Sequence, residues 1–174
     1  ELHLEYAEEG KLHPATLLGE PGGQRGSGQT SPDLAFHVNG RRGLILIENK
    51  LTEHSFYPCS ARRRTDSRGR KGNPDPARCL DLKGVLADPH ARCHQCVWGR
   101  KYWDILRPVV NVEAASVLKC CPAAYAGYQL FRQQALAEGI ATRGPYDFVY
   151  SCVALDARNE ALLTCLAKTG IADL

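Results

Sequence analysis

The stretch from Gly43 to Lys50 constrains this chain more than any other. Four consecutive aliphatic residues, Leu44-Ile45-Leu46-Ile47, end abruptly in Glu48-Asn49-Lys50. A strand that is apolar on both faces is typical of the buried centre of a sheet. Glu48 and Lys50 are two positions apart, so both side chains leave the same face of the strand. The sequence therefore predicts a charged pair at the end of a central buried strand.

A second strand, at residues 32–39, precedes this one and begins with Pro32-Asp33. Its apolar residues alternate with others, and the dipeptide Asn39-Gly40 that follows is a strong hairpin signal. Folding the chain at this turn brings Asp33 back toward Glu48. We therefore expect the two carboxylates to meet across a pair of antiparallel strands.

Two carboxylates at one strand end are suited to Mg²⁺, because hard cations take oxygen ligands. The backbone carbonyl of Asn49 could supply a third oxygen. Lys50 could then position or deprotonate an attacking water, or stabilise charge on a phosphorus centre. This chemistry predicts hydrolysis of a phosphodiester, although a Glu-x-Lys pair alone is also common on protein surfaces.

These residues resemble the PD-(D/E)XK nuclease superfamily, whose motif is matched by Ser31-Pro32-Asp33 and by the strand ending in Glu48-Asn49-Lys50. The stretch 20–60, together with 98–103, is similar to a family of bacterial restriction endonucleases within it. The resemblance implies a metal-dependent DNA endonuclease that uses Mg²⁺ or Mn²⁺, with a role in restriction or defence. Members often carry another acid on their first helix. No such helix is evident in this sequence, and Glu20 is the candidate substitute.

The remaining patterns predict further strands at 2–8, 16–18, 109–112 and 146–155, and helices at 90–106, 122–138 and 157–168. This order, with the resemblance, predicts an α/β restriction-endonuclease-like core in which helices flank a mixed central sheet. At 174 residues we expect a single domain, 1–174, with 56–106 as a basic, Cys-rich insert.

Four of the eight cysteines suggest a second metal site: Cys59, Cys79, Cys93 and Cys96. The last two form a Cys-x2-Cys pair, the usual half-site of tetrahedral zinc. An iron–sulfur cluster also takes four thiolates and is the less favoured alternative. The competing interpretation is a set of scattered free thiols. Cys120, Cys121, Cys152 and Cys165 lie in apolar stretches, which indicates core thiols.

A run of basic residues follows the predicted active strand directly, and we expect it to bind DNA phosphates: Arg62, Arg63, Arg64, Arg68, Arg70 and Lys71. The alternative is an ordinary solvated loop. On the predicted helix 122–138, Gln129 and Gln133 are four residues apart and share a face. Their amides are auxiliary candidates for the active site, or else exposed side chains of an ordinary helix.

Two other functions fit the same features: a non-catalytic zinc-stabilised DNA-binding module, and a repair exonuclease that uses the same site. Because enzymes of this kind often cut both strands as homodimers, a homodimer is also expected. The chain has no apolar run long enough for a membrane span and no signal-peptide pattern, and its cysteine usage favours the reducing cytoplasm. Met is absent, which favours a fragment or a processed chain.

Overall fold

A four-stranded mixed sheet organises the described part of the chain, as the sequence predicted. The computed structural model describes residues 2–4, 6, 9–22, 28–38, 42–62 and 71–173. The strands follow the order β1 (Leu2–Leu4), β2 (Leu34–Val38), β3 (Gly43–Lys50) and β4 (Phe148–Leu155). β2 pairs antiparallel with β1 and β3, whereas β3 and β4 are parallel. The predicted active strand, β3, therefore has a neighbour on each side.

The helices are short, with two exceptions near the C-terminus. The α-helices are α1 (Pro14–Leu18), α2 (Leu82–Ala87), α3 (Pro89–Arg92), α4 (His94–Val97), α5 (Tyr102–Leu106), α6 (Val112–Val117), α7 (Tyr128–Arg143) and α8 (Glu160–Thr169). Single 3-10 turns are η1 (Gly10–Leu12), η2 (Ser60–Arg62), η3 (Pro76–Leu80), η4 (Arg107–Val109) and η5 (Pro122–Ala124).

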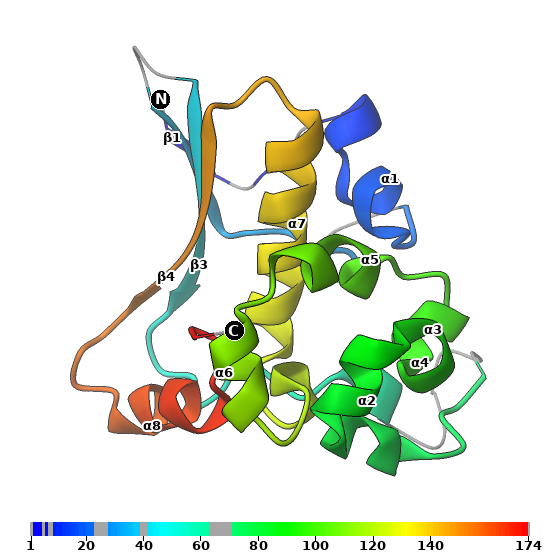
Figure 1. Cartoon of the computed structure of the whole chain (residues 1–174). Helices are drawn as coiled ribbons and strands as arrows, with labels where there is room; N and C mark the ends of the chain where they lie inside the picture. Colours follow the sequence, from blue (N-terminus) through cyan, green and yellow to red (C-terminus); the bar gives the residue numbers. More distant parts are fainter. Residues whose placement is uncertain are drawn as a thin grey trace.

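Helix α7 is the central element of the core. It runs along one face of the sheet, and α1 and α5 lie on its opposite side (Figure 1). Its buried residues Phe131, Leu136 and Ile140 share one hydrophobic cluster with Leu44 and Leu46 of β3. The side chains of β3 that face α7 thus include the two leucines and, continuing the same alternation, Glu48 and Lys50.

Residues 56–106, predicted as an insert, contribute to this same cluster. Tyr102 and Trp103 of α5 are 1% exposed and contact Phe131 ring to edge. Val85 of α2 and Cys59 are also buried in it. The short helices of this segment are therefore held by the core that α7 and the sheet provide.

The predicted strand at 16–18 is wrong, because these residues belong to α1. Pro14 occupies the first helical position, and the ring of His13 accepts a hydrogen bond from the amide of Ala15. Pro is favoured at a helix start because its fixed φ suits the first turn. The helix ends at Gly19, whose φ of 64° is left-handed, and a Cβ there would lie 2.1 Å from the carbonyl oxygen of Gly99.

The long helix predicted at 122–138 is present but displaced. Residues Pro122–Ala124 form the turn η5, and α7 begins at Tyr128 and continues to Arg143. It passes beyond the predicted end at residue 138 and through Gly139, which is buried beside Ile105 and Leu17. Close packing therefore outweighs the low helix propensity of glycine.

Three other predictions need correction. The single helix predicted at 90–106 is divided among α3, α4 and α5, and the strand predicted at 109–112 contains the end of η4 and the start of α6. The last helix begins at Glu160, three residues after the predicted start, with Asn159 as its cap, and it ends at Thr169, one residue after the predicted end. The strands predicted at 32–39, 43–51 and 146–155 correspond to β2, β3 and β4. The turn at Asn39-Gly40 lies outside the described residues.

Candidate active site

The register of the β2–β3 hairpin brings Asp33 to Glu48. Leu34 pairs with Ile47 in the antiparallel ladder, so Asp33 lies opposite Glu48. The carboxylate of Asp33 accepts a hydrogen bond from the backbone amide of Asn49 at 2.8 Å. The two acids predicted from the sequence therefore meet at the end of β3, and the backbone of Asn49 lies between them.

Lys50 lies directly against Glu48 on the same face of β3. Its Nζ is 2.9 Å from Glu48 Oε1, and the two side chains are only 5% and 9% exposed. Glu53, which the sequence analysis did not single out, places Oε1 3.5 Å from the same Nζ. The other oxygen of Glu53 accepts from the backbone amides of Leu51 and Thr52. Lys50 is thus enclosed by two carboxylates.

Burial and neighbouring charges shape the electrostatics of this pair. Burial raises the pKa of Glu48 above its ordinary value, and the negative charge of Asp33 adds to that rise, although Lys50 opposes it. Burial acts to lower the pKa of Lys50, but the hydrogen bonds and charges of Glu48 and Glu53 outweigh it and raise that pKa. Lys50 is therefore a cation at neutral pH, in a site where negative charge is concentrated.

Gln129 joins the site from the start of α7. Its Nε2 donates to Glu48 Oε1 at 2.8 Å, while its Oε1 is buried with no hydrogen-bond partner among the described residues. The second predicted amide, Gln133, has different partners: the backbone oxygens of Leu46 and Cys152 and the hydroxyl of Ser151. Gln129 therefore contacts the carboxylate of Glu48, and Gln133 joins α7 to β3 and β4.

Backbone carbonyls rather than a capping side chain hold the first turn of α7. The amide of Tyr128 donates to the oxygen of Tyr57 at 3.0 Å, and the amide of Gln129 donates to that of Phe56 at 3.0 Å. The ring of Tyr57 lies 5.9 Å from Nζ of Lys50. The segment after β3 thus positions Gln129 and adds an aromatic ring to the site, which the sequence analysis did not foresee.

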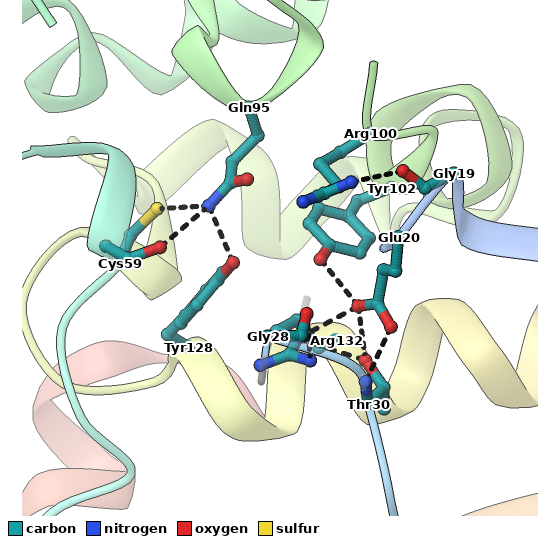
Figure 2. Close-up of polar contacts among 11 residues, drawn as sticks. Gly19, Glu20, Gly28, Thr30, Cys59, Gln95, Arg100, Tyr102, Tyr128 and Arg132 are labelled. Atoms are coloured by element: carbon teal, nitrogen blue, oxygen red, sulfur yellow. Dashed lines mark hydrogen bonds and ion pairs between the residues drawn. The ribbon is translucent and has the colours of Figure 1, made fainter. Parts of the chain in front are cut away.

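Glu20 belongs to a buried polar network beside α7 (Figure 2). One of its oxygens accepts from Tyr102 Oη at 2.6 Å, Thr30 Oγ1 at 2.6 Å and Arg132 Nε at 3.1 Å, and the other accepts from the amide of Thr30. Arg100 donates to the neighbouring carbonyl of Gly19. The carboxylate of Glu20 thus joins α5 and α7, and its auxiliary role at the active site stays a prediction.

The four cysteines predicted to bind metal lie near one another in the fold. Burial raises the pKa of Cys59 to about 11 and that of Cys79 to about 12, and the neighbouring thiols act in the same direction. Cys93 and Cys96 are hydrogen-bonded through their thiols, which lowers the pKa of Cys96. Cys121 interacts with Cys59, Cys79 and Cys93 and so joins the group. Within the described ranges, no set of three or more His, Cys, Asp or Glu side chains is already arranged to hold a metal ion.

Two of the predicted DNA-binding cations are described. Arg62 donates to the carbonyl of Ala124 at 3.0 Å, and its guanidinium carbon lies 4.6 Å from the centre of the Tyr125 ring. Lys71 is exposed, and its backbone oxygen accepts from the side chains of His94 and Trp98. The other four lie outside the described residues: Arg63, Arg64, Arg68 and Arg70.

A mixed sheet that ends in Asp33, Glu48 and Lys50 is consistent with a restriction-endonuclease-like α/β protein. The sequence from residue 3 to 170 matches the family described as restriction endonuclease associating with ARP. The chain therefore belongs to this family. It matches no curated protein and no solved structure. In the part of the chain that the structure describes, none of the helices has the length and apolarity to cross a membrane.

Proposed function

We propose that this protein is a metal-dependent DNA endonuclease that hydrolyses phosphodiester bonds at Asp33, Glu48 and Lys50. The observation that carries the proposal is the meeting of these three residues on one face of the sheet. Two carboxylates and a buried ammonium group, brought together by strand register, form an arrangement suited to a phosphate and its metal. The family, described as a restriction endonuclease, supports a nuclease role.

The residues present fit Mg²⁺ or Mn²⁺. Asp33 and Glu48 would provide carboxylate oxygens, and Asn49 would provide its backbone carbonyl, which suits hard cations. The like charge of Asp33 contributes to the raised pKa of Glu48, and a cation would relieve that repulsion. The partnerless Oε1 of Gln129, adjacent to Glu48, is a further oxygen that could accept from a water molecule in the site.

A bound divalent ion supplies Lewis acidity, which makes the phosphodiester more electrophilic and a water molecule more acidic. Lys50 contributes its positive charge. Because its Nζ lies 2.9 Å from Oε1 of Glu48, a proposed metal ligand, we assign it to orienting the attacking water or removing its proton, and to stabilising charge on the phosphate oxygens. The bond between water oxygen and phosphorus forms, a phosphorus–ester oxygen bond breaks, and a hydroxyl and a phosphate end are left.

DNA is the proposed substrate, and Arg62 with the basic residues that follow it would contact phosphates. Such contacts would fix the position of the duplex without reading its sequence. A homodimer would bring two such sites to the two DNA strands. Light scattering on the purified protein measures whether it is a dimer. A role in restriction or defence is part of the same proposal.

Cleavage of closed-circular and linear DNA in Mg²⁺, Mn²⁺ or EDTA tests the proposal. Asp33→Ala, Glu48→Gln and Lys50→Ala should each abolish cutting, while Glu113→Gln, a change at an exposed acid on α6, should leave it intact. Cutting of linear ends with closed circles spared would favour a repair exonuclease. DNA binding with no cutting in either metal would overturn the enzymatic proposal in favour of a non-catalytic zinc-stabilised module.

A further inference from the structure

Two segments beside the active site run antiparallel and bring two tyrosines onto facing stretches of backbone. The amide of Phe56 donates to the oxygen of Ala126 at 2.8 Å, and that of Cys59 donates to the oxygen of Ala123 at 2.8 Å. These two hydrogen bonds bracket Tyr57 on one segment and Tyr125 on the other. Because the two tyrosines are far apart in the sequence, sequence patterns alone did not predict this arrangement.

Both tyrosines are exposed, and each has a cation at its ring. Tyr57 is 53% exposed and Tyr125 is 56% exposed, so both rings are accessible to a ligand. Nζ of Lys50 lies 5.9 Å from the centre of the Tyr57 ring, and the guanidinium carbon of Arg62 lies 4.6 Å from the centre of the Tyr125 ring. Aromatic rings interleaved with cations are the usual means of binding a single nucleic-acid strand.

The backbone at Tyr57 is held in an unfavourable conformation. Its φ of 56° is in the left-handed region, which side-chain-bearing residues rarely adopt, and it is the one such non-glycine residue in the described part of the chain. The hydrogen bond from Tyr128 to its carbonyl keeps it there. Strained residues of this kind cluster at functional sites, so an exposed ring fixed in this way points to a ligand.

A cavity opens next to Tyr125. Its volume is about 400 Å³, and its lining includes His54, Ser55, Tyr125 and Lys168. The lining is mainly apolar, with polar or basic groups from residues such as His54, Ser55 and Lys168, which suits a flat heterocycle with an attached phosphate. The space beside the Tyr125 ring is therefore open to a base.

We propose that Tyr57 and Tyr125 form a stacking site for unpaired bases of a DNA strand, next to the phosphate held at Lys50. The inference rests on the proposed nuclease function and deepens it by naming the substrate class: DNA with a single-stranded or locally opened segment. Lys50 and Arg62 would contact the phosphates that flank the stacked bases.

Binding in EDTA tests this without cleavage. The probes are a fluorescent single-stranded oligothymidylate and an abasic strand of equal length, which has the same phosphate charge and no bases. The wild-type protein should bind the oligothymidylate about tenfold more tightly, since stacking on an aromatic ring contributes substantially per base. Equal affinity for the two strands would overturn the proposal, because the contacts would then be to the backbone alone.

The variants Tyr57→Leu and Tyr125→Leu should each reduce this preference for bases severalfold, whereas Tyr57→Phe, which keeps the ring, should retain it. Tyr150→Leu is the matched control, since Tyr150 is 59% exposed on β4. Thermal melting of each variant shows whether it folds. A preference unchanged in both leucine variants that fold, or lost equally in Tyr150→Leu, would contradict the assignment.

The two proposals fail in different ways. Cutting that depends on Asp33 and Lys50, without a preference for bases, would overturn the stacking site and leave the nuclease intact. A tyrosine-dependent preference for bases in a protein that cuts no DNA would overturn the nuclease and leave a strand-binding surface. Asp33→Ala, which removes a proposed metal ligand, should abolish cutting and keep the preference.

Discussion

The side-chain amide of Gln129 donates to the same oxygen of Glu48 that lies 2.9 Å from Nζ of Lys50. One carboxylate oxygen is thus held by two donors from separate elements, α7 and β3. We expect Gln129→Leu to weaken Mn²⁺ binding by about 10- to 100-fold, the usual cost of losing a group that orients a metal ligand. Titration calorimetry measures this affinity.

Gln134→Leu is the control for that change, because Gln134 lies on the same helix and bonds to Glu138 instead. Its Mn²⁺ affinity should equal that of the wild type. Equal Mn²⁺ affinities in the wild type, Gln129→Leu and Gln134→Leu would show that Gln129 does not contribute to metal binding.

The buried pair of Glu20 and Arg132 should matter greatly for stability. Glu20 is fully buried and accepts from Tyr102, Thr30 and Arg132. Glu20→Gln would leave Arg132 a buried cation without its counter-charge, and we expect a loss of about 3–5 kcal/mol in the free energy of unfolding. Urea denaturation monitored by circular dichroism measures it.

A surface pair provides the comparison. Nη2 of Arg158 lies 2.6 Å from Oδ2 of Asp156, and the Arg158 side chain is 91% exposed. Asp156→Asn should leave the free energy of unfolding almost unchanged, because solvent screens such pairs. A similar loss in both variants would show that Glu20 does not have the structural role assigned to it.

Alkaline pH should destabilise the metal-free fold through its buried thiols. Burial raises the pKa of Cys59 from 9.0 to about 11. The folded state therefore keeps this proton while the unfolded chain loses it, so the stabilisation is full below pH 9.0 and declines as pH rises toward 11. The decline due to this one thiol should be on the order of 2 kcal/mol, given ~1.4 kcal/mol per pKa unit.

Urea midpoints at pH 8 and pH 10.5, with a chelator present, measure this decline. Cys59→Ala should be less stable at pH 8 because it leaves a cavity, but its stability should fall less between the two pH values. Cys152→Ala, at an exposed thiol, should follow the wild type. A steeper fall in Cys59→Ala than in the wild type would contradict the expectation.

The predicted thiolate metal centre is tested by elemental analysis of the purified protein. Cys59, Cys79, Cys93 and Cys96 lie close enough to influence each other's ionisation, yet binding would require them to move toward a common centre. We expect about one zinc per chain, as in tetrahedral structural sites, with iron as the alternative.

Cys93→Ser should lower that content strongly, and Cys120→Ser should leave it unchanged. Neither zinc nor iron at near-stoichiometric level in the wild type would mean that the cysteines are free thiols. Visible absorbance, which iron–sulfur clusters show and zinc does not, separates the two metals.

The sequence predicted the placement of Asp33, Glu48 and Lys50 well because that placement depends on local rules. Strand alternation puts Glu48 and Lys50 on one face, and the β2–β3 register puts Asp33 opposite Glu48. Both rules depend on a few neighbouring residues. The Gln129 contact was accessible for a similar reason, since four-residue spacing marks one face of a helix.

Features that depend on distant partners were missed. The strand predicted at 16–18 is a helix whose Leu17 and Leu18 are buried in the core, and Gly139 lies inside α7, buried beside Ile105. The bonds of Glu20 come from residues up to 112 positions away. Periodicity and propensity contain no information about such contacts.

The carbonyls of Phe56 and Tyr57 complete the first turn of α7 in place of a capping side chain. The segment after β3 is therefore part of the helix that carries Gln129, although the two are far apart in sequence. Protein engineering that shortens or replaces residues 56–106 should preserve these two carbonyls. A deletion that starts at Phe56 would remove both carbonyls and fray the helix at the end that touches Glu48.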